Sequence, residues 1–176
     1  VGKILGAQIV GAGGVKARID VLAAAIAMGA DTDFLTSLEL SYAPPFGAAK
    51  DPVNMAGYMA ENDLAGLVRF LPADRLKEAR EEGVRVLDVR TESELSHAPA
   101  ASDAQIPLDE LRERFSELDR SQRWAVLCKV GQRAYTAARF LQQAGYDAEV
   151  IAGGYTSLKM EEFEASPVAA APAKAL

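Results

Sequence analysis

The chain has 176 residues, of which 49% are hydrophobic and 25% charged, and its formal net charge at pH 7 is -6. These values are typical of a folded globular protein with one or two domains. A net negative chain without clustered lysines and arginines does not suit nucleic acid or an anionic membrane, so we expect neither as a partner. The longest apolar stretch, residues 21–28, is too short to span a bilayer, and we expect a cytoplasmic protein.

The sequence contains one cysteine, Cys128, and one histidine, His97. A single cysteine cannot form an internal disulfide, and these two residues cannot complete a tetrahedral zinc site, so we expect no metal. Cys128 is therefore inert, reactive, or used between chains. The chain begins with Val1 in an apolar segment, which suggests a fragment of a longer polypeptide.

The first third of the chain predicts one strand and two helices. Residues 3–10 have the apolar pattern of a buried strand, and a glycine-rich turn separates them from a helix over about residues 17–28. That helix is apolar on most sides, which fits either a subunit interface or an ordinary core helix. Asp51 followed by proline predicts the start of a helix that continues to about residue 61.

From residue 72 onward, predicted helices and strands alternate. This order favours right-handed crossovers between parallel strands and therefore an open α/β sheet. Strands are predicted at 84–89, 124–128 and 148–151. Helices are predicted up to Gly83, from the capping box of Thr91 and Glu94, over 108–118, and up to about residue 144.

Cys128 lies at the end of the most apolar predicted strand, where open α/β sheets bind their ligands. The loop at 129–133 contains a glycine and leads into a helix, so its backbone N–H groups can surround an anion. Lys129 and Arg133 add positive charge. Such surroundings favour a thiolate, and the same donors would hold the terminal sulfur of a persulfide or the oxyanions of thiosulfate. The alternative is a small buried hydrophobic side chain.

Several motifs over about residues 70–163 resemble, in order, the landmarks of rhodanese domains. They are Leu87-Asp88-Val89-Arg90, Glu94, Ile106-Pro107-Leu108, the Cys-x-x-Gly-x-Arg loop at 128–133 and Gly153-Gly154-Tyr155. The resemblance implies that Cys128 is a nucleophile and that Asp88 and Arg90 are supporting polar groups. It also implies a loop that cradles the transferred sulfur, made of Lys129, Val130, Gly131, Gln132 and Arg133. Phosphatases of this fold have one more residue between Cys and Arg, so the loop resembles the sulfur-handling type.

The sequence departs from the family pattern at residues 96–101, Ser-His-Ala-Pro-Ala-Ala, where members usually show Gly-His-Ile-Pro-Gly-Ala. The spacing from there to Ile106 is also longer than usual. Because of this departure, the resemblance does not determine the conformation of the second loop that faces the substrate. The preferred sulfur donor and the activity of the domain are left open for the same reason. We interpret His97 as an exposed or structural residue and not as a partner of Cys128.

Three N-terminal motifs resemble the C-terminal dimerisation domain of pyridine nucleotide-disulfide oxidoreductases, in the coenzyme A disulfide reductase and NADH oxidase branch. They are the segments at 3–8, 42–46 and 51–56, and the similarity covers about residues 1–62. The resemblance implies a homodimer, with Tyr42 pointing into the partner's active site, where a phenol can protonate a leaving thiolate. A turn tyrosine packed beside two prolines is the alternative. The resemblance to the oxidoreductases further implies that the full-length protein uses FAD, NAD(P)H and coenzyme A, and that this fragment alone binds none of them.

We therefore predict an α/β fold, with a rhodanese-like open parallel sheet and flanking helices at 72–163. A partial α+β dimerisation domain at 1–62 and a linker at 63–71 precede it, and a disordered tail at 164–176 follows. The predicted function is sulfur transfer through a Cys128 persulfide, as the C-terminal part of a flavin-dependent reductase of coenzyme A disulfide, persulfides or polysulfides. The alternatives are a non-catalytic dimerisation and partner-binding module with an inactive rhodanese-like domain and, more weakly, phosphatase chemistry.

Overall fold

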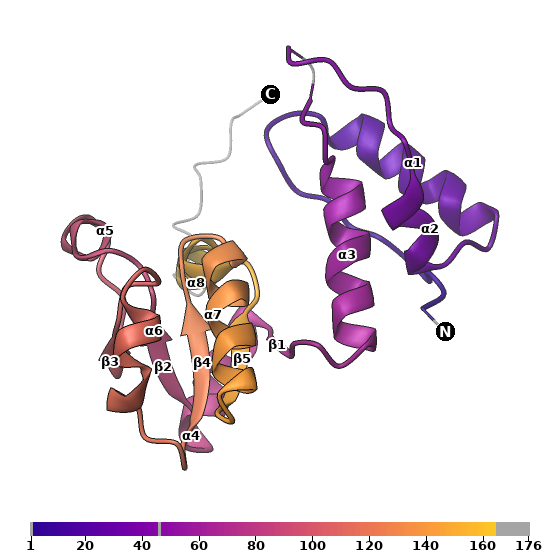
Figure 1. Ribbon diagram of the computed structural model, residues 1–176. Coiled ribbons are helices and arrows are strands. Elements are labelled where there is room, and N and C mark those ends of the chain that lie inside the picture. Colours follow the sequence, from indigo (N-terminus) through magenta and orange to yellow (C-terminus); the bar gives the residue numbers. More distant parts are fainter. Residues whose placement is uncertain (1, 46, 165–176) are drawn as a thin grey trace, which may run out of the picture. The chain divides into compact units, whose positions relative to one another are not determined.

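The computed structural model describes residues 2–45 and 47–164, and the side chains as far as residue 160 (Figure 1). The chain forms two compact units, Val1–Leu67 and Val68–Leu176. The division between them falls inside the predicted linker at 63–71. The predicted tail lies, from residue 165 onward, outside the described residues. Each unit has its own core.

The N-terminal unit contains three helices, α1 (Val15–Ala27), α2 (Thr32–Ser37) and α3 (Pro52–Leu64). Helix α3 begins where the sequence predicts it. The side chain of Asp51 accepts a hydrogen bond from the N–H of Val53, and the side chain of Asn54 accepts one from the N–H of Asp51. The buried amide of Asn54 also donates to two carbonyl groups at the end of α2. This single side chain therefore fastens α2 to α3.

Residues 3–10 do not form the predicted buried strand. Lys3 makes one antiparallel bridge with Asp31, and the pairing goes no further. Leu5 and Val10 are 85% and 83% exposed. A strand is stable only when a neighbour continues its ladder of hydrogen bonds, and no strand in the described part of this unit does so. The apolar pattern gave the right local conformation, an extended chain, but not its burial.

The C-terminal unit contains a five-stranded sheet in which all paired strands are parallel. Its order is β1-β5-β4-β2-β3, so β4 is central. The parallel α/β architecture predicted from the sequence is confirmed. Parallel strands place all their carboxyl ends at one edge of the sheet, where we look for the functional site. The strands are β1 (Phe70–Leu71), β2 (Arg85–Asp88), β3 (Ala104–Gln105), β4 (Arg123–Leu127) and β5 (Asp147–Ile151).

Helices pack on both faces of this sheet (Figure 1). Along β4 and the residue after it, Trp124, Val126 and Cys128 belong to a core with α6 and α7, whereas Ala125 and Leu127 belong to a core with α4 and α8. This alternation explains why β4 is apolar throughout. The helical segments are η1 (Ala73–Arg75), α4 (Leu76–Glu81), α5 (Glu92–His97), α6 (Leu111–Arg114), η2 (Phe115–Glu117), α7 (Gln132–Gln143) and α8 (Gly154–Glu164).

The helix predicted over 108–118 is replaced by two short segments, α6 and η2. The N–H of Leu108 donates to the carbonyl of Val89, beyond the end of β2, so residue 108 still belongs to the strand connection. A turn follows, in which the N–H of Glu110 donates to the carbonyl of Pro107, and only then does α6 begin. The long-range bond to Val89 therefore shortens the helix. None of the helices in the described ranges combines the length and apolarity needed to cross a membrane.

Candidate active site

Cys128 lies directly after β4, at the carboxyl edge of the sheet. Its side chain is 1% exposed and packs in the core with α7. The sulfur is nevertheless in contact with a polar group, because its Sγ accepts a hydrogen bond from the N–H of Gly131 at 3.1 Å. The thiol is therefore held between hydrocarbon on one side and the backbone of its own loop on the other.

Gly131 shapes the loop after Cys128. Its φ of 102° lies in the left-handed region, which favours glycine, and the residue directly precedes α7. The first turn of α7 is closed by a hydrogen bond from the N–H of Tyr135 to the carbonyl of Gly131. This conformation lets the same glycine start the helix and direct its own N–H to Sγ.

The N-terminus of α8 fixes the orientation of the loop peptides. The N–H of Tyr155 donates to the carbonyl of Cys128 at 2.8 Å, and the N–H of Thr156 donates to the carbonyl of Lys129 at 3.1 Å. The hydroxyl of Thr156 also donates to Lys129, at 3.0 Å. In a trans peptide the N–H points opposite to the carbonyl, so the N–H groups of Lys129 and Val130 point away from α8. The amide that the structure places on the sulfur is the next one along the loop, that of Gly131.

Gly154 allows this close approach of α8 to the loop. A Cβ atom at this position would lie 2.4 Å from the carbonyl oxygen of Cys128 and 2.9 Å from that of Lys129. Its φ of 60° is also left-handed. A glycine is thus required at Gly154 for both reasons, and the Gly-Gly-Tyr motif reflects the contact between α8 and the cysteine loop.

Arg133 is paired with Glu94, a residue that the sequence places in a capping box and not at the site. Two nitrogens of Arg133 donate to the two carboxylate oxygens of Glu94, at 2.7 and 2.6 Å. These bonds lower the pKa of Glu94 to about 2, and they raise the pKa of Arg133. The guanidinium charge predicted to serve the transferred sulfur is therefore largely compensated. The capping box of Thr91 and Glu94 was visible in the sequence, but it gave no signal for a partner 39 residues away.

The Glu94–Arg133 pair makes a testable contribution to stability. Because the folded-state pKa of Glu94 is lowered from 4.5 to about 2, the stabilisation is complete above the ordinary value and is lost as the pH falls toward 2. Both side chains are one-third exposed, so we expect Glu94→Gln to reduce the free energy of unfolding at pH 7 by at most about 1 kcal/mol. In urea unfolding curves, this deficit should shrink steadily between pH 4.5 and 3. Glu92→Gln, a neighbouring exposed carboxylate of α5, is the matched control and should show no such dependence.

Asp88 and Arg90 form a buried ion pair behind the cysteine loop. Arg90 donates from Nε to both carboxylate oxygens of Asp88 at 3.0 Å and from Nη2 at 2.6 Å. Its remaining nitrogen, Nη1, donates to the carbonyl of Ala98 at 2.9 Å. The pair thus fastens the segment where the sequence departs from the family pattern.

The other predicted site residues lie at the surface. Lys129, Val130 and Gln132 have exposed side chains, so they contribute backbone to the loop and leave their side chains toward solvent. His97 ends α5 with its Nδ1 2.7 Å from the carbonyl of Ser93. Tyr42 is 54% exposed and belongs to the N-terminal unit, so neither unit brings it together with Cys128. Within the described ranges, no cluster of side chains suits a metal ion.

Comparison with known proteins agrees with this geometry. Residues 72–161, more than half of the chain, match the family described as "Rhodanese-like domain". The chain therefore belongs to the rhodanese-like domain family.

Among solved structures, reduced Bacillus anthracis CoADR-RHD is 39% identical, with a TM-score of 0.78 over 85% of this chain and 27% of that one. A NAD-dependent persulfide reductase from A. fulgidus is 38% identical, with a TM-score of 0.74 over 84% of this chain and 26% of that one. Coenzyme A disulfide reductase from Staphylococcus epidermidis is 44% identical over 59 residues, which is 34% of this chain and 14% of that enzyme. The chain thus corresponds to a minor part of each relative.

Proposed function

We propose that the C-terminal unit transfers sulfane sulfur through a persulfide on Cys128. The observation that supports this most directly is the hydrogen bond from the N–H of Gly131 to Sγ at 3.1 Å, at the carboxyl edge of the central strand. Amide groups arranged around a sulfur stabilise negative charge on it. A persulfide and a thiolate both need that stabilisation, so the same loop serves both halves of a transfer reaction.

The reaction balances without an external oxidant or reductant. In the first half, the Cys128 thiolate attacks the outer sulfur of a donor such as thiosulfate, the sulfur–sulfur bond of the donor breaks, and sulfite leaves with the electron pair. In the second half, an acceptor thiolate attacks the terminal sulfur of the persulfide. The sulfur–sulfur bond at Cys128 then breaks, and the Cys128 thiolate is restored. Polysulfides and small-molecule persulfides, coenzyme A persulfide among them, can replace thiosulfate as the donor, because each carries an outer sulfur and releases a thiolate or a shorter polysulfide in place of sulfite.

The mass of the intact chain tests this proposal. Incubation with thiosulfate or a polysulfide is expected to add one sulfur atom, and cyanide is expected to remove it. Cys128 is the only cysteine, so the addition can be assigned to it directly. Cys128→Ser should abolish the addition. A folded wild-type chain that takes up no sulfur from either donor would contradict the proposal and favour a non-catalytic domain.

We further propose that this transfer serves a cytoplasmic, flavin-dependent reductase of coenzyme A disulfide, persulfides or polysulfides. Its cofactors would be FAD and NAD(P)H, and coenzyme A would be part of its substrate. The similarity to a coenzyme A disulfide reductase and to a NAD-dependent persulfide reductase supports this assignment. The described residues do not themselves fit a dinucleotide site, since the glycine turn at 11–14 follows an extended segment and not a strand of a parallel sheet.

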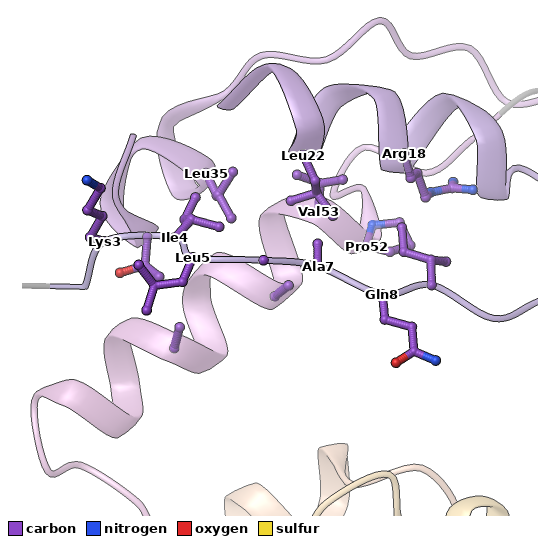
Figure 2. Close-up of a pocket in the computed structure, with 15 residues that line it drawn as sticks. Lys3, Ile4, Leu5, Ala7, Gln8, Arg18, Leu22, Leu35, Pro52 and Val53 are labelled. Carbon is purple, nitrogen blue, oxygen red and sulfur yellow. The ribbon is translucent and has the colours of Figure 1, made fainter. Parts of the chain in front are cut away.

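A homodimer formed by the N-terminal unit is part of the same proposal. A cavity of about 590 Å³ lies between the extended segment at 3–9 and helices α1 and α3, and its lining is mostly apolar (Figure 2). Leu5, which lines this cavity, is exposed, and so are Met55 and Met59 on α3. Exposed apolar surface of this kind is typical of subunit contacts. Tyr42, exposed in the same unit, would then act as the proton donor in the partner's active site. Sedimentation equilibrium showing only monomer at high concentration would contradict the dimer.

A further inference from the structure

Tyr155 lies where three segments of the C-terminal unit meet. Its N–H donates to the carbonyl of Cys128 at 2.8 Å. Its ring lies against the guanidinium of Arg90, whose Cζ is 4.4 Å from the ring centroid. Arg90 in turn donates to the carbonyl of Ala98 at 2.9 Å. The cysteine loop, the end of β2 and the atypical segment after α5 are thus connected through Arg90 and Tyr155.

Arg90 provides a fixed surface for this ring. It is 1% exposed, and Asp88 binds two of its nitrogens at 2.6 to 3.0 Å. The third nitrogen is bound to Ala98, so the plane of the guanidinium has a single orientation. A cation is attracted to the face of an aromatic ring, and the attraction is stronger where water is excluded. The ring of Tyr155 is therefore held in place by a group that cannot itself rotate.

The position of this ring has consequences for the peptides around it. Tyr155 and Thr156 supply the two N–H groups that bind the carbonyls of Cys128 and Lys129. Those bonds fix the orientation of the peptides that lead to Gly131, whose N–H donates to the sulfur. A shift of the main chain at 155–156 would therefore move the N–H of Gly131 relative to the sulfur without changing any residue of the loop.

We propose that Tyr155 is a positioning residue for sulfur transfer, which sets the direction of the cysteine-loop amides through its contact with Arg90. The proposal rests on the function proposed above. It also gives the segment after α5 a role, because the carbonyl of Ala98 completes the hydrogen bonding of Arg90. A change in that segment reaches the cysteine loop through Arg90 and Tyr155.

The rate of alkylation by iodoacetamide at pH 7 tests this, since Cys128 is the only thiol. Three variants of the full chain are compared with the wild type. Tyr155→Leu removes the ring but keeps an apolar side chain, and Tyr155→Phe keeps the ring face. Leu158→Ala removes apolar contacts from the same helix and the same core but leaves the ring of Tyr155 in place, and it serves as the matched control.

Tyr155→Leu is expected to slow the alkylation of Cys128 by about tenfold, because the amide of Gly131 is turned away from the sulfur. Sulfur transfer from thiosulfate should fall by about tenfold in kcat with KM nearly unchanged. Tyr155→Phe should retain the wild-type rate of alkylation. Leu158→Ala should lower the thermal midpoint but leave the rate of alkylation unchanged.

An unchanged rate of alkylation in Tyr155→Leu, or an equal decrease in Leu158→Ala, would overturn the proposal. If Tyr155→Leu does not fold, Tyr155→Met permits the same comparison with a more adaptable side chain. A wild-type chain that takes up no sulfur contradicts the proposed function but still allows the alkylation comparison. The two failures are therefore distinguishable.

Discussion

Replacement of Asp88 by alanine is expected to lower the free energy of unfolding of the C-terminal unit by about 3–5 kcal/mol. The guanidinium of Arg90 is 1% exposed and would be left without its carboxylate partner. A buried charge without a partner is costly, because it loses both water and its ion pair. Urea denaturation at pH 7, followed by the fluorescence of Trp124, measures the change, since this is the only tryptophan and lies in the core of the same unit.

Asp147→Ala is the control for this experiment. Asp147 also forms ion pairs with arginines, Arg69 and Arg123, but all three side chains are more than 40% exposed. Exposed pairs contribute little, so we expect a loss below about 1 kcal/mol. Equal losses in the two variants would show that burial of Arg90 is not what makes Asp88 necessary.

Gly154→Ala is expected to reduce sulfur transfer by about a hundredfold, an effect typical of a displacement near 1 Å at a reacting group. The added Cβ would lie 2.4 Å from the carbonyl oxygen of Cys128, so α8 and the cysteine loop must separate. The left-handed conformation alone should cost about 1–3 kcal/mol of stability. Rates of sulfur transfer from thiosulfate to cyanide, with unfolding curves of the same samples, measure both effects.

Gly83→Ala is the control that separates the cost of a left-handed conformation from the effect of displacing the cysteine loop. Gly83 has a φ of 93°, also left-handed, but an added Cβ would meet nothing within 4 Å. We therefore expect a comparable loss of stability and a nearly normal rate of transfer. A similar loss of transfer in both variants would mean that general destabilisation, and not the contact with Cys128, explains the result.

The fold of the C-terminal unit was largely predictable because its main signals are local. The apolar run that became β4 and the glycine that ends α7 can be recognised without knowing their neighbours. The edge strands β1 and β3 could not be predicted, since each has two residues and exists through its pairing with β5 or β2. The error at residues 3–10 has the same origin: an apolar pattern does not show whether a neighbouring strand is present.

In the candidate site, too, the residues that could be predicted are those whose signal is local. Cys128 and Gly131 were identified from a loop of consecutive positions, and the structure places the N–H of one on the sulfur of the other. The pairing of Glu94 with Arg133 and the contact of Arg90 with Tyr155 could not be predicted from spacing. They join segments 39 and 65 residues apart in the chain, and only the folded sheet brings them together.

The parallel direction of the strands places the turns that lead into them on the side of the sheet away from Cys128. The turns that lead into β2, β4 and β5, near Gly83, Gln122 and Gly145, lie at the opposite edge of the sheet from Cys128. A fluorophore, an affinity tag or a fused protein introduced at those turns leaves the thiol and its surroundings in place. The unit therefore has a side suited to attachment, opposite the edge of the sheet that holds Cys128.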